Sequence, residues 1–453
     1  MLSIATLKEL LRLSLPMVVS QGAYAVMVFT DRWFMSQIDA VHIAATLGGG
    51  VASFFCISLF LGVITYANAM VAQYFGADEL EKCPRVVTQG SVMILMSLPV
   101  LAVATYFVGQ LFGSIGHDPR QVELERVYFY ILMAGSLFTL MKICIASYFS
   151  GIGQTKVVMI CDVAGMLLNI PLSYALIFGK LGFPAMGISG AALGTIIASL
   201  FALVLFYSFY LAKEHREKFR VLESFHLDVG IMKRYLRLGV PSGFELFMNV
   251  ATFNLFLLMF QSYGIAQGAA MAIVFNWDML CFVPMIGLNI GVMSLIGRFV
   301  GANDMHKANQ VIVAGLVVAV AYSGILGLLF INYRVPLVEV FSTPTGDFSE
   351  ISDLASYMMI GLSTYVIADA TSLIAGGVLR GAGDTRWLMI TSISLHWLML
   401  IAQYFIIMVY DYGPEVSWWA FVAMIMSLAL VYLYRLQGDV WRHPERLARI
   451  MAE

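Results

Sequence analysis

The sequence predicts an all-α polytopic membrane protein with twelve transmembrane helices, arranged as two six-helix lobes related by a pseudo-two-fold axis along the membrane normal. Three observations predict this fold. Sixty per cent of the 453 residues are hydrophobic and 12% are charged, which is about half the charged fraction of a soluble globular protein. Apolar runs of membrane-spanning length occur twelve times. The two halves of the chain also share loop motifs.

Each predicted span is a run of about 20 apolar residues, which as a helix crosses roughly 30 Å of hydrocarbon. The first run is flanked by Lys8 and Arg12 and is too long for the core of a cleaved signal peptide, so we assign it as the first span. The second and eighth runs are long enough to require a tilt or a kink. The predicted spans are 14–35, 44–72, 86–112, 127–149, 157–180, 186–212, 238–262, 269–297, 309–331, 354–379, 387–411 and 416–436.

An even number of spans places both termini on one side of the membrane. Twenty of the 26 Lys and Arg residues then lie in segments on that side, four lie on the opposite side and two lie within spans. The positive-inside rule therefore predicts cytoplasmic termini. We expect an N-terminal lobe over 1–212, a cytoplasmic linker over 213–233, a C-terminal lobe over 234–436 and a cytoplasmic tail over 437–453.

Three pairs of segments form an internal repeat. Because each half has six spans, both halves enter the membrane in the same direction. Two-lobed repeats of this kind are a transporter architecture, in which a cavity between the lobes opens alternately to each side. The pairs are 11–16 (LRLSLP) with 236–241 (LRLGVP), Gly76-Ala77 with Gly301-Ala302, and 151–156 (GIGQTK) with 381–386 (GAGDTR).

The sequence lacks the features that would indicate an ATPase, a nucleic-acid-binding protein or an enzyme. The chain has no GxxxxGK[ST] motif and no predicted soluble domain, so an ion gradient is the expected energy source. The net charge of −2 argues against a nucleic-acid partner. The seven histidines show no HExxH grouping and the five cysteines no CxxC spacing. We therefore expect no enzyme active site, cofactor or metal centre. A passive channel would leave the repeat and the buried acids unexplained.

Charged residues within the predicted spans of the first half are candidates for function, because placing a charge at mid-membrane costs about 2.5–3.5 kcal/mol or more of free energy. Asp31 lies late in the first span, and its short side chain cannot reach the surface as Arg32 can. We expect Asp31 to be functional. In the fifth span, Asn169 and Ser173 flank Pro171, which removes a backbone donor and favours a kink. Their oxygens suit either Na⁺ or a protonated Asp31.

Two further polar features of this half are typical of helix packing. Lys142 and Asp162 lie near the same cytoplasmic boundary, and we expect a structural ion pair between them. Thr195 follows the small-residue segment 187–194, which permits close contact between helices. By itself Thr195 indicates packing.

The second half contains three acids within predicted spans. Glu245 lies one turn before Asn249 in the seventh span, and Asp278 lies in the eighth. Asp369 lies in the tenth span one turn after Tyr365, whose phenol or ring suits contact with the carboxyl group or a cationic ligand. We expect Asp369 to be functional. The pattern leaves open whether Glu245 and Asp278 are functional or pack helices.

Several segments carry a resemblance to a known family. They are Pro16 with Asp31, 71–77 (VAQYFGA), 169–171 (NIP), 282–285 (FVPM) and 379–385 (LRGAGDT). Together they resemble the multidrug and toxic compound extrusion (MATE) family, in particular its bacterial NorM- and DinF-like members, over nearly the whole chain. The resemblance implies two six-helix lobes in a V shape and export of cationic, amphipathic compounds in exchange for H⁺ or Na⁺.

By position, the resemblance implies that Asp31 is the acid of the N-terminal lobe, with Asn169 and Thr195 as companions. Ser173 stands where some relatives have a second acid. Tyr365 and Asp369 match the tyrosine and acid of the C-terminal lobe.

One position departs from the family pattern. The family often places a Glu eight residues after the proline of the seventh span, Pro241, where this chain has Asn249. Glu245 lies one turn earlier on the same face, about 6 Å along the axis, and is a candidate replacement. The departure argues against a NorM-type Na⁺ site in the C-terminal lobe.

The sequence thus predicts a secondary antiporter of the bacterial inner membrane that exports amphipathic cationic drugs, with H⁺ favoured as the coupling ion. Protonation of Asp31 is expected to bend the first span near Pro16 and to weaken drug binding. The two lobes already supply a cavity, so a monomer suffices. The alternative is a flippase for lipid-linked oligosaccharides or other lipids, which would be expected to have a more cationic cavity than Arg32 and Lys142 provide.

The candidate residues group by role. The cation-coupling residues are Asp31, Asn169, Ser173, Thr195, Glu245, Asp278, Tyr365 and Asp369, and the conformational residues are Pro16 and Pro171. The substrate cavity is expected to include Asp31, Asn249, Tyr365 and Asp369. If Na⁺ is the coupling ion, its candidate sites are Asp31 with Asn169, and Glu245 with Asp369.

Overall fold

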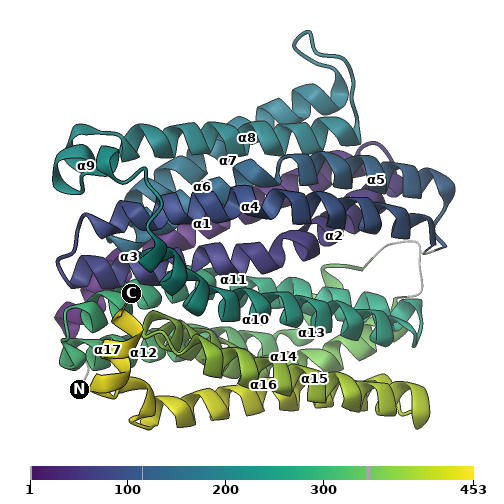
Figure 1. Ribbon diagram of the computed structural model, residues 1–453. Helices are drawn as coiled ribbons and strands as arrows, with labels where there is room; N and C mark the ends of the chain where they lie inside the picture. The colour runs from purple at the N-terminus through teal and green to yellow at the C-terminus, as the bar shows by residue number, and fades with distance from the viewer. Residues whose placement is uncertain (1–2, 115, 343–347, 453) are drawn as a thin grey trace.

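The computed structural model describes residues 3–114, 116–342 and 348–452, and every regular element within them is a helix. Eleven helices are long and apolar enough to cross a membrane. The pair Pro119–Ala134 and Ser136–Gly151, bent by 46°, makes a twelfth span. The predicted twelve spans are confirmed when this pair is counted as one. Helix α1 begins, and the last helix α17 lies, at the same end of the molecule, which we call the terminal end (Figure 1).

Two lobes lie one above the other in Figure 1, the N-terminal lobe in purple to teal and the C-terminal lobe in green to yellow. The first lobe contains α1 (Ile4–Ser36), α2 (Ala40–Thr65), α3 (Ala67–Gly76), α4 (Lys82–Leu111), η1 (Phe112–Ser114), α5 (Pro119–Ala134), α6 (Ser136–Gly151), α7 (Thr155–Phe178) and α8 (Ile188–Tyr210). Two short helices follow, α9 (Lys213–Lys218) and η2 (Val221–Glu223).

The second lobe contains α10 (Val229–Gln261), α11 (Ile265–Gly301), α12 (Met305–Asn332), α13 (Arg334–Glu339), α14 (Ser349–Gly381), α15 (Thr385–Tyr404), the π-helical turn η3 (Phe405–Val409) and α16 (Pro414–Gln437). The chain ends in η4 (Val440–Arg442) and α17 (Pro444–Met451). Helix α10 begins five residues before the predicted start of this lobe, because the Asp228 side chain caps it by accepting from the Ile231 amide at 3.1 Å.

Helix breaks distinguish the two lobes. The long second span is interrupted at Tyr66 between α2 and α3, whereas its counterpart α11 is a continuous helix through Pro284. The fourth span bends at Gly135, where a Cβ would meet Ile196 at 2.3 Å, and the sequence pattern did not predict this bend. Helix α7 continues through Pro171 without interruption.

The lobes meet through reciprocal backbone contacts at the terminal end. A Cβ on Gly76 of α3 would lie 1.8 Å from the carbonyl oxygen of Arg298 of α11, and a Cβ on Gly301 would lie 2.0 Å from that of Gln73. The two contacts are equivalent, because adding the repeat offset of 225 to Gly76 and Gln73 gives Gly301 and Arg298. The pair therefore follows the pseudo-two-fold relation of the lobes.

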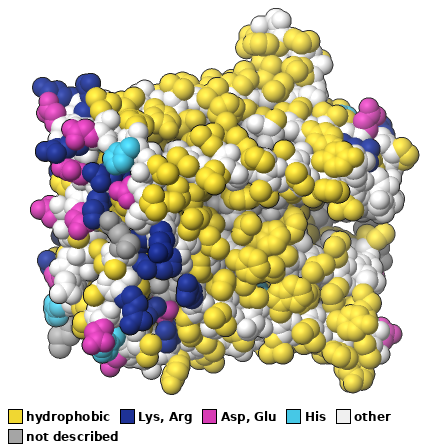
Figure 2. Space-filling view, viewed as in Figure 1, with side chains coloured by type: hydrophobic (Ala, Val, Ile, Leu, Met, Phe, Trp, Pro, Cys, Tyr) yellow, Lys and Arg dark blue, Asp and Glu magenta, His cyan; other side chains and the backbone are white. Residues whose placement is uncertain are grey.

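A second reciprocal pair lies further along the same interface. Gly62 of α2 packs on the backbone of Gly243 of α10, and Gly287 of α11 packs on the backbone of Val18 of α1, again related by the repeat offset. At the opposite end the surface is hollowed between the lobes (Figure 2). The lobes are thus closed together at the terminal end and separate toward the other end.

The C-terminal tail packs against this closed end. Arg234 of α10 is fully buried and donates from Nε to the Ile450 carbonyl of α17 at 2.9 Å and from Nη2 to Oε1 of Gln73 of α3 at 2.5 Å. Gln73 in turn donates to the Gly381 carbonyl of α14 at 2.7 Å. Buried hydrogen bonds therefore connect both lobes and the tail.

Candidate functional site

Asp31 lies where α1, α7 and α8 meet in the N-terminal lobe. The residue is 4% exposed, and its Oδ2 accepts a hydrogen bond from Oγ1 of Thr195 at 2.9 Å. Ser173 of α7 lies beside the same carboxyl group. A Cβ on Gly194 would meet the Ser173 hydroxyl at 2.3 Å, so the glycine before Thr195 lets α7 and α8 approach. The structure brings these three residues together.

Four buried polar atoms, on Asp31 and on Asn169 and Ser173 of α7, have no hydrogen-bond partner within the described residues. They are Oδ1 of Asp31, both amide atoms of Asn169 and the hydroxyl of Ser173. A buried polar atom without a partner is costly, and a buried ionised carboxylate more so. The carboxyl group of Asp31 can lower this cost by taking up a proton or a cation, because Ser173 lies beside it and Asn169 lies one turn before Ser173 on α7.

A second acid cluster lies in the C-terminal lobe between α11 and α14. Asp278 and Asp369 lie within electrostatic range of each other, and the Tyr365 hydroxyl lies near both. Oδ1 of Asp278 and the Tyr365 hydroxyl are buried without a partner in the described residues. The Tyr365 ring packs edge-on against Phe421 of α16 at 5.8 Å. Two neighbouring carboxylates repel each other when both are ionised, so this cluster can also hold a proton or a cation.

The structure places Glu245 outside this second cluster. Its Oε1 accepts from Nη2 of Arg380 at 2.8 Å, and its side chain is 3% exposed. Arg380 lies eleven residues after Asp369 on α14, which is about 16 Å along the helix axis. This pairing argues against a Na⁺ site shared by Glu245 and Asp369, because Arg380 already neutralises Glu245 at a different level of the lobe.

The Glu245–Arg380 pair predicts a large effect on stability. Arg380→Met is expected to destabilise the protein by about 3–5 kcal/mol, because it leaves a buried carboxylate without its partner. The double variant Glu245→Gln, Arg380→Met is expected to recover most of this loss. Thermal unfolding of the purified variants in detergent measures both effects. Equal melting temperatures for Arg380→Met and wild type would contradict the pairing.

Other predicted residues have partners of their own. Asn249 donates from Nδ2 to the Ser392 hydroxyl at 2.8 Å, which links α10 to α15. Lys142 and Asp162 form the expected ion pair, at 3.2 Å between Nζ and Oδ1. Ser20 of α1 also donates to Asp162, a partner that the sequence did not predict.

Helix α1 crosses from one lobe to the other at Pro16. Leu10 and Leu13, before the proline, belong to the apolar core of the C-terminal lobe. Met17 and Phe34, after it, belong to the cores of the N-terminal lobe. Pro16 therefore marks the point at which α1 passes from the core of one lobe to the cores of the other.

Helix α10 makes the equivalent crossing at Pro241. Tyr235 and Leu238 lie in the core of the N-terminal lobe, whereas Phe256 and Phe260 lie in the core of the C-terminal lobe. Pro241 was not among the conformational residues predicted from the sequence. The repeat of the LRLxxP motif could have identified it, since Pro241 stands at the position of Pro16 in the second half.

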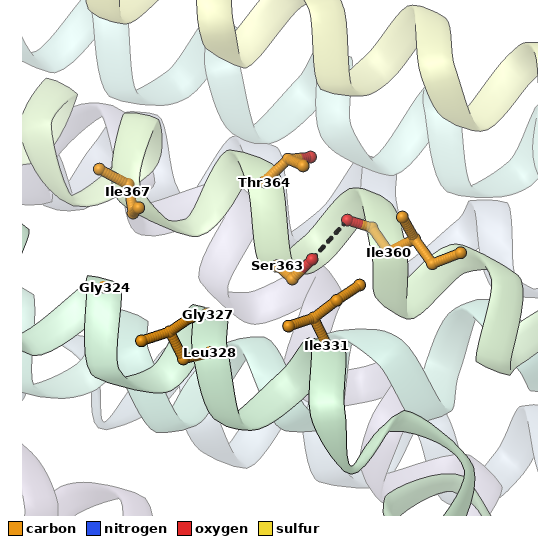
Figure 3. Close-up of a pocket in the computed structure, with 8 residues that line it drawn as sticks. All are labelled: Gly324, Gly327, Leu328, Ile331, Ile360, Ser363, Thr364 and Ile367. Carbon is orange, nitrogen blue, oxygen red and sulfur yellow. Dashed lines mark hydrogen bonds between the residues drawn. The ribbon is translucent and has the colours of Figure 1, made fainter.

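A notch of about 230 Å³ lies between α12 and α14, and none of its lining residues belongs to either acid cluster (Figure 3). Apolar side chains and two glycines, Gly324 and Gly327, form most of it. Its two hydroxyls are used within α14, by Ser363 to the Ile360 carbonyl and by Thr364 to the Gly361 carbonyl, each at 2.7 Å. The notch offers no unpaired polar side-chain group to a ligand.

Comparisons with known proteins agree with this arrangement. The family model MatE matches residues 16–175 and 241–405. A probable multidrug resistance protein NorM from Mannheimia succiniciproducens is 25% identical over 437 residues, covering 95% of this chain and 93% of the relative. The multidrug resistance protein MdtK of Proteus mirabilis is 25% identical over 453 residues, covering 96% and 97%. A solved MOP superfamily transporter from Pyrococcus furiosus has the same fold, with a TM-score of 0.87, 19% identity and coverage of 99% and 97%.

Proposed function

The chain belongs to the MatE family of transporters, and from that premise we propose that it exports amphipathic cationic drugs in exchange for protons, with Asp31 as the coupling acid. The observation that carries this proposal is the buried carboxyl group of Asp31, whose Oδ2 is bound by Thr195 while Oδ1 has no partner in the described residues. Relatives named multidrug resistance proteins support the drug class.

We propose that the terminal end faces the cytoplasm of a bacterial inner membrane. Lys and Arg side chains gather at this end in Figure 2, and a broad hydrophobic band follows it. Basic residues are retained preferentially on the cytoplasmic side. The closed contact between the lobes then lies on the cytoplasmic side, and the hollow between them opens outward.

In the proposed cycle, water reaches Asp31 from the open outer end and delivers a proton to Oδ1. The protonated carboxyl group can donate to the amide oxygen of Asn169 or the hydroxyl of Ser173, which are buried and free to accept. Loss of the negative charge removes the attraction of the site for a cationic drug. The drug then leaves outward, and the site is ready to release its proton on the cytoplasmic side.

Bending of α1 is the proposed link between protonation and the movement of the lobes. Because α1 packs in the C-terminal core before Pro16 and in the N-terminal cores after it, relative rotation of the lobes must be absorbed near this residue. A proline inside a helix lacks one backbone hydrogen bond, which makes it a suitable point of bending. The new hydrogen bonds of protonated Asp31 would change how the outer part of α1 packs on α7 and α8.

Ethidium efflux from proteoliposomes tests the proposal, with a pH gradient and a Na⁺ gradient imposed separately on the wild-type chain. We expect efflux with the pH gradient alone and no added efflux from the Na⁺ gradient. Efflux that requires Na⁺ would contradict proton coupling. Absence of efflux with either gradient, in vesicles where the protein is folded, would contradict drug export and favour the lipid-flippase alternative.

A further inference from the structure

A basic pocket of about 460 Å³ opens at the terminal end, where α17 packs on α10 and α15. Basic side chains from three helices line it, together with the apolar side chains of Leu238, Val440 and Ile450. Figure 2 shows Lys and Arg side chains gathered near the C-terminal end of the chain, at the border of the hydrophobic band. The charged lining residues are Arg237, Arg386, Glu445, Arg446 and Arg449, and His443 lies beside them.

The pocket carries an excess of positive charge. Nη2 of Arg446 is bound to Oδ1 of Asp384 at 2.7 Å, so that arginine is neutralised. Arg237 donates to backbone carbonyls of the tail, including that of Ala452 at 2.7 Å. Among the described residues, no carboxylate pairs with Arg237, Arg386 or Arg449. Three guanidinium groups therefore face one carboxylate, that of Glu445.

Apolar surface continues from the pocket along α10 and α15. Next to Arg237, Leu236 is 41% exposed and Val240 is 44% exposed. Ile390, one turn after Arg386, is 61% exposed. The pocket thus joins unpaired arginines to exposed apolar side chains on two adjacent helices. A ligand that complements both parts must combine an anionic head with apolar chains.

We propose that this pocket binds the headgroup of an anionic phospholipid, with the phosphate held by Arg386 and Arg449 and the acyl chains lying along α10 and α15. Guanidinium groups bind phosphate through two parallel hydrogen bonds and are the usual choice for this anion. Basic pockets at the membrane border select anionic headgroups in the same way. A zwitterionic lipid offers no net charge to the unpaired arginines.

The repeat predicts a single such site. The N-terminal lobe has basic residues at the equivalent positions, Arg12 for Arg237 and Lys156 for Arg386. Helix α17 follows only the second lobe and supplies Arg446 and Arg449 there. The binding stoichiometry is therefore expected to be one lipid per chain.

Native mass spectrometry of the full chain tests the proposal, with dioleoylphosphatidylglycerol, dioleoylphosphatidylcholine and inorganic phosphate as separate probes. The test variant is Arg386→Gln with Arg449→Gln, whose side chains carry no ion pair in the described residues. The control, Lys213→Gln with Arg216→Gln, removes two charges from α9, outside the pocket. We expect one phosphatidylglycerol per wild-type chain, bound roughly 30-fold more weakly by the test variant and unchanged in the control.

Three results would overturn the proposal. The first is that the test variant binds phosphatidylglycerol as tightly as the wild type. The second is that the control variant loses as much affinity for phosphatidylglycerol as the test variant. The third is that the wild type binds phosphatidylcholine as tightly as phosphatidylglycerol. Inorganic phosphate that binds as tightly as the lipid, and is lost in the same variant, would assign the pocket to a free anion instead. Unchanged thermal unfolding of the test variant shows that its fold is retained. The result does not depend on drug export, since lipid binding is measured directly.

Discussion

Asp31→Asn is expected to abolish proton-driven export while leaving the fold intact. Asparagine has nearly the same shape and can still accept the hydrogen bond from Thr195, which is 2.9 Å long in the structure. It cannot bind or release a proton, and it adds no charge to a buried site. Ethidium efflux from energised vesicles, together with thermal unfolding of the purified variant, measures both outcomes.

Asp369→Asn is the matched control for this prediction, because it makes the same change in the acid cluster of the other lobe. If Asp31 is the coupling acid, Asp369→Asn alters drug selectivity or rate but retains a response to the pH gradient. Wild-type export by Asp31→Asn, with loss of export in Asp369→Asn, would move the coupling step to the C-terminal lobe. The coupling proton would then bind in the cluster of Asp278 and Asp369.

The fold could be predicted because its main determinants are visible in the sequence. Apolar runs give the spans, and the LRLxxP motif around Pro16 and Pro241 relates the two halves. The bend at Gly135 was not predictable, since it depends on contact with Ile196 of another helix. The sequence also did not predict that α1 and α10 each pack partly in the core of the other lobe. A leucine can be recognised as buried from the sequence, but the sequence does not indicate which of the two cores it joins.

In the candidate site, too, some features could be predicted from the sequence and others could not. Asp31 was identifiable because a short acid within a span is costly. Its bond to Thr195 depends on the approach of α1 to α8, and residue patterns alone indicated packing for Thr195. The partner of Glu245 was not predictable, because Arg380 lies 135 positions away along the chain, near the predicted cytoplasmic boundary. The long arginine side chain reaches inward from that boundary to a buried carboxylate.

Gly76→Ala combined with Gly301→Ala is expected to prevent closure of the terminal end and to reduce export to background. Added Cβ atoms would lie 1.8 Å and 2.0 Å from carbonyl oxygens of the facing lobe. Both obstacles are backbone atoms within helices, which cannot turn aside as a side chain can. Overpacking of this kind typically costs about 1–3 kcal/mol per site. The lobes can avoid that cost by separating at this end, so the closed state is selectively destabilised.

The distance between spin labels at Lys156→Cys and Arg386→Cys, after replacement of the five native cysteines, measures this separation. Both sites are exposed and lie in different lobes at the terminal end. We expect a longer label distance in the double alanine variant than in its parent. Gly22→Ala is the control, because a Cβ there meets nothing within 4 Å. An unchanged distance together with normal export would show that α3 and α11 need no close glycine contact, and the contact between Gly62 and Gly243 would then have to hold the lobes closed.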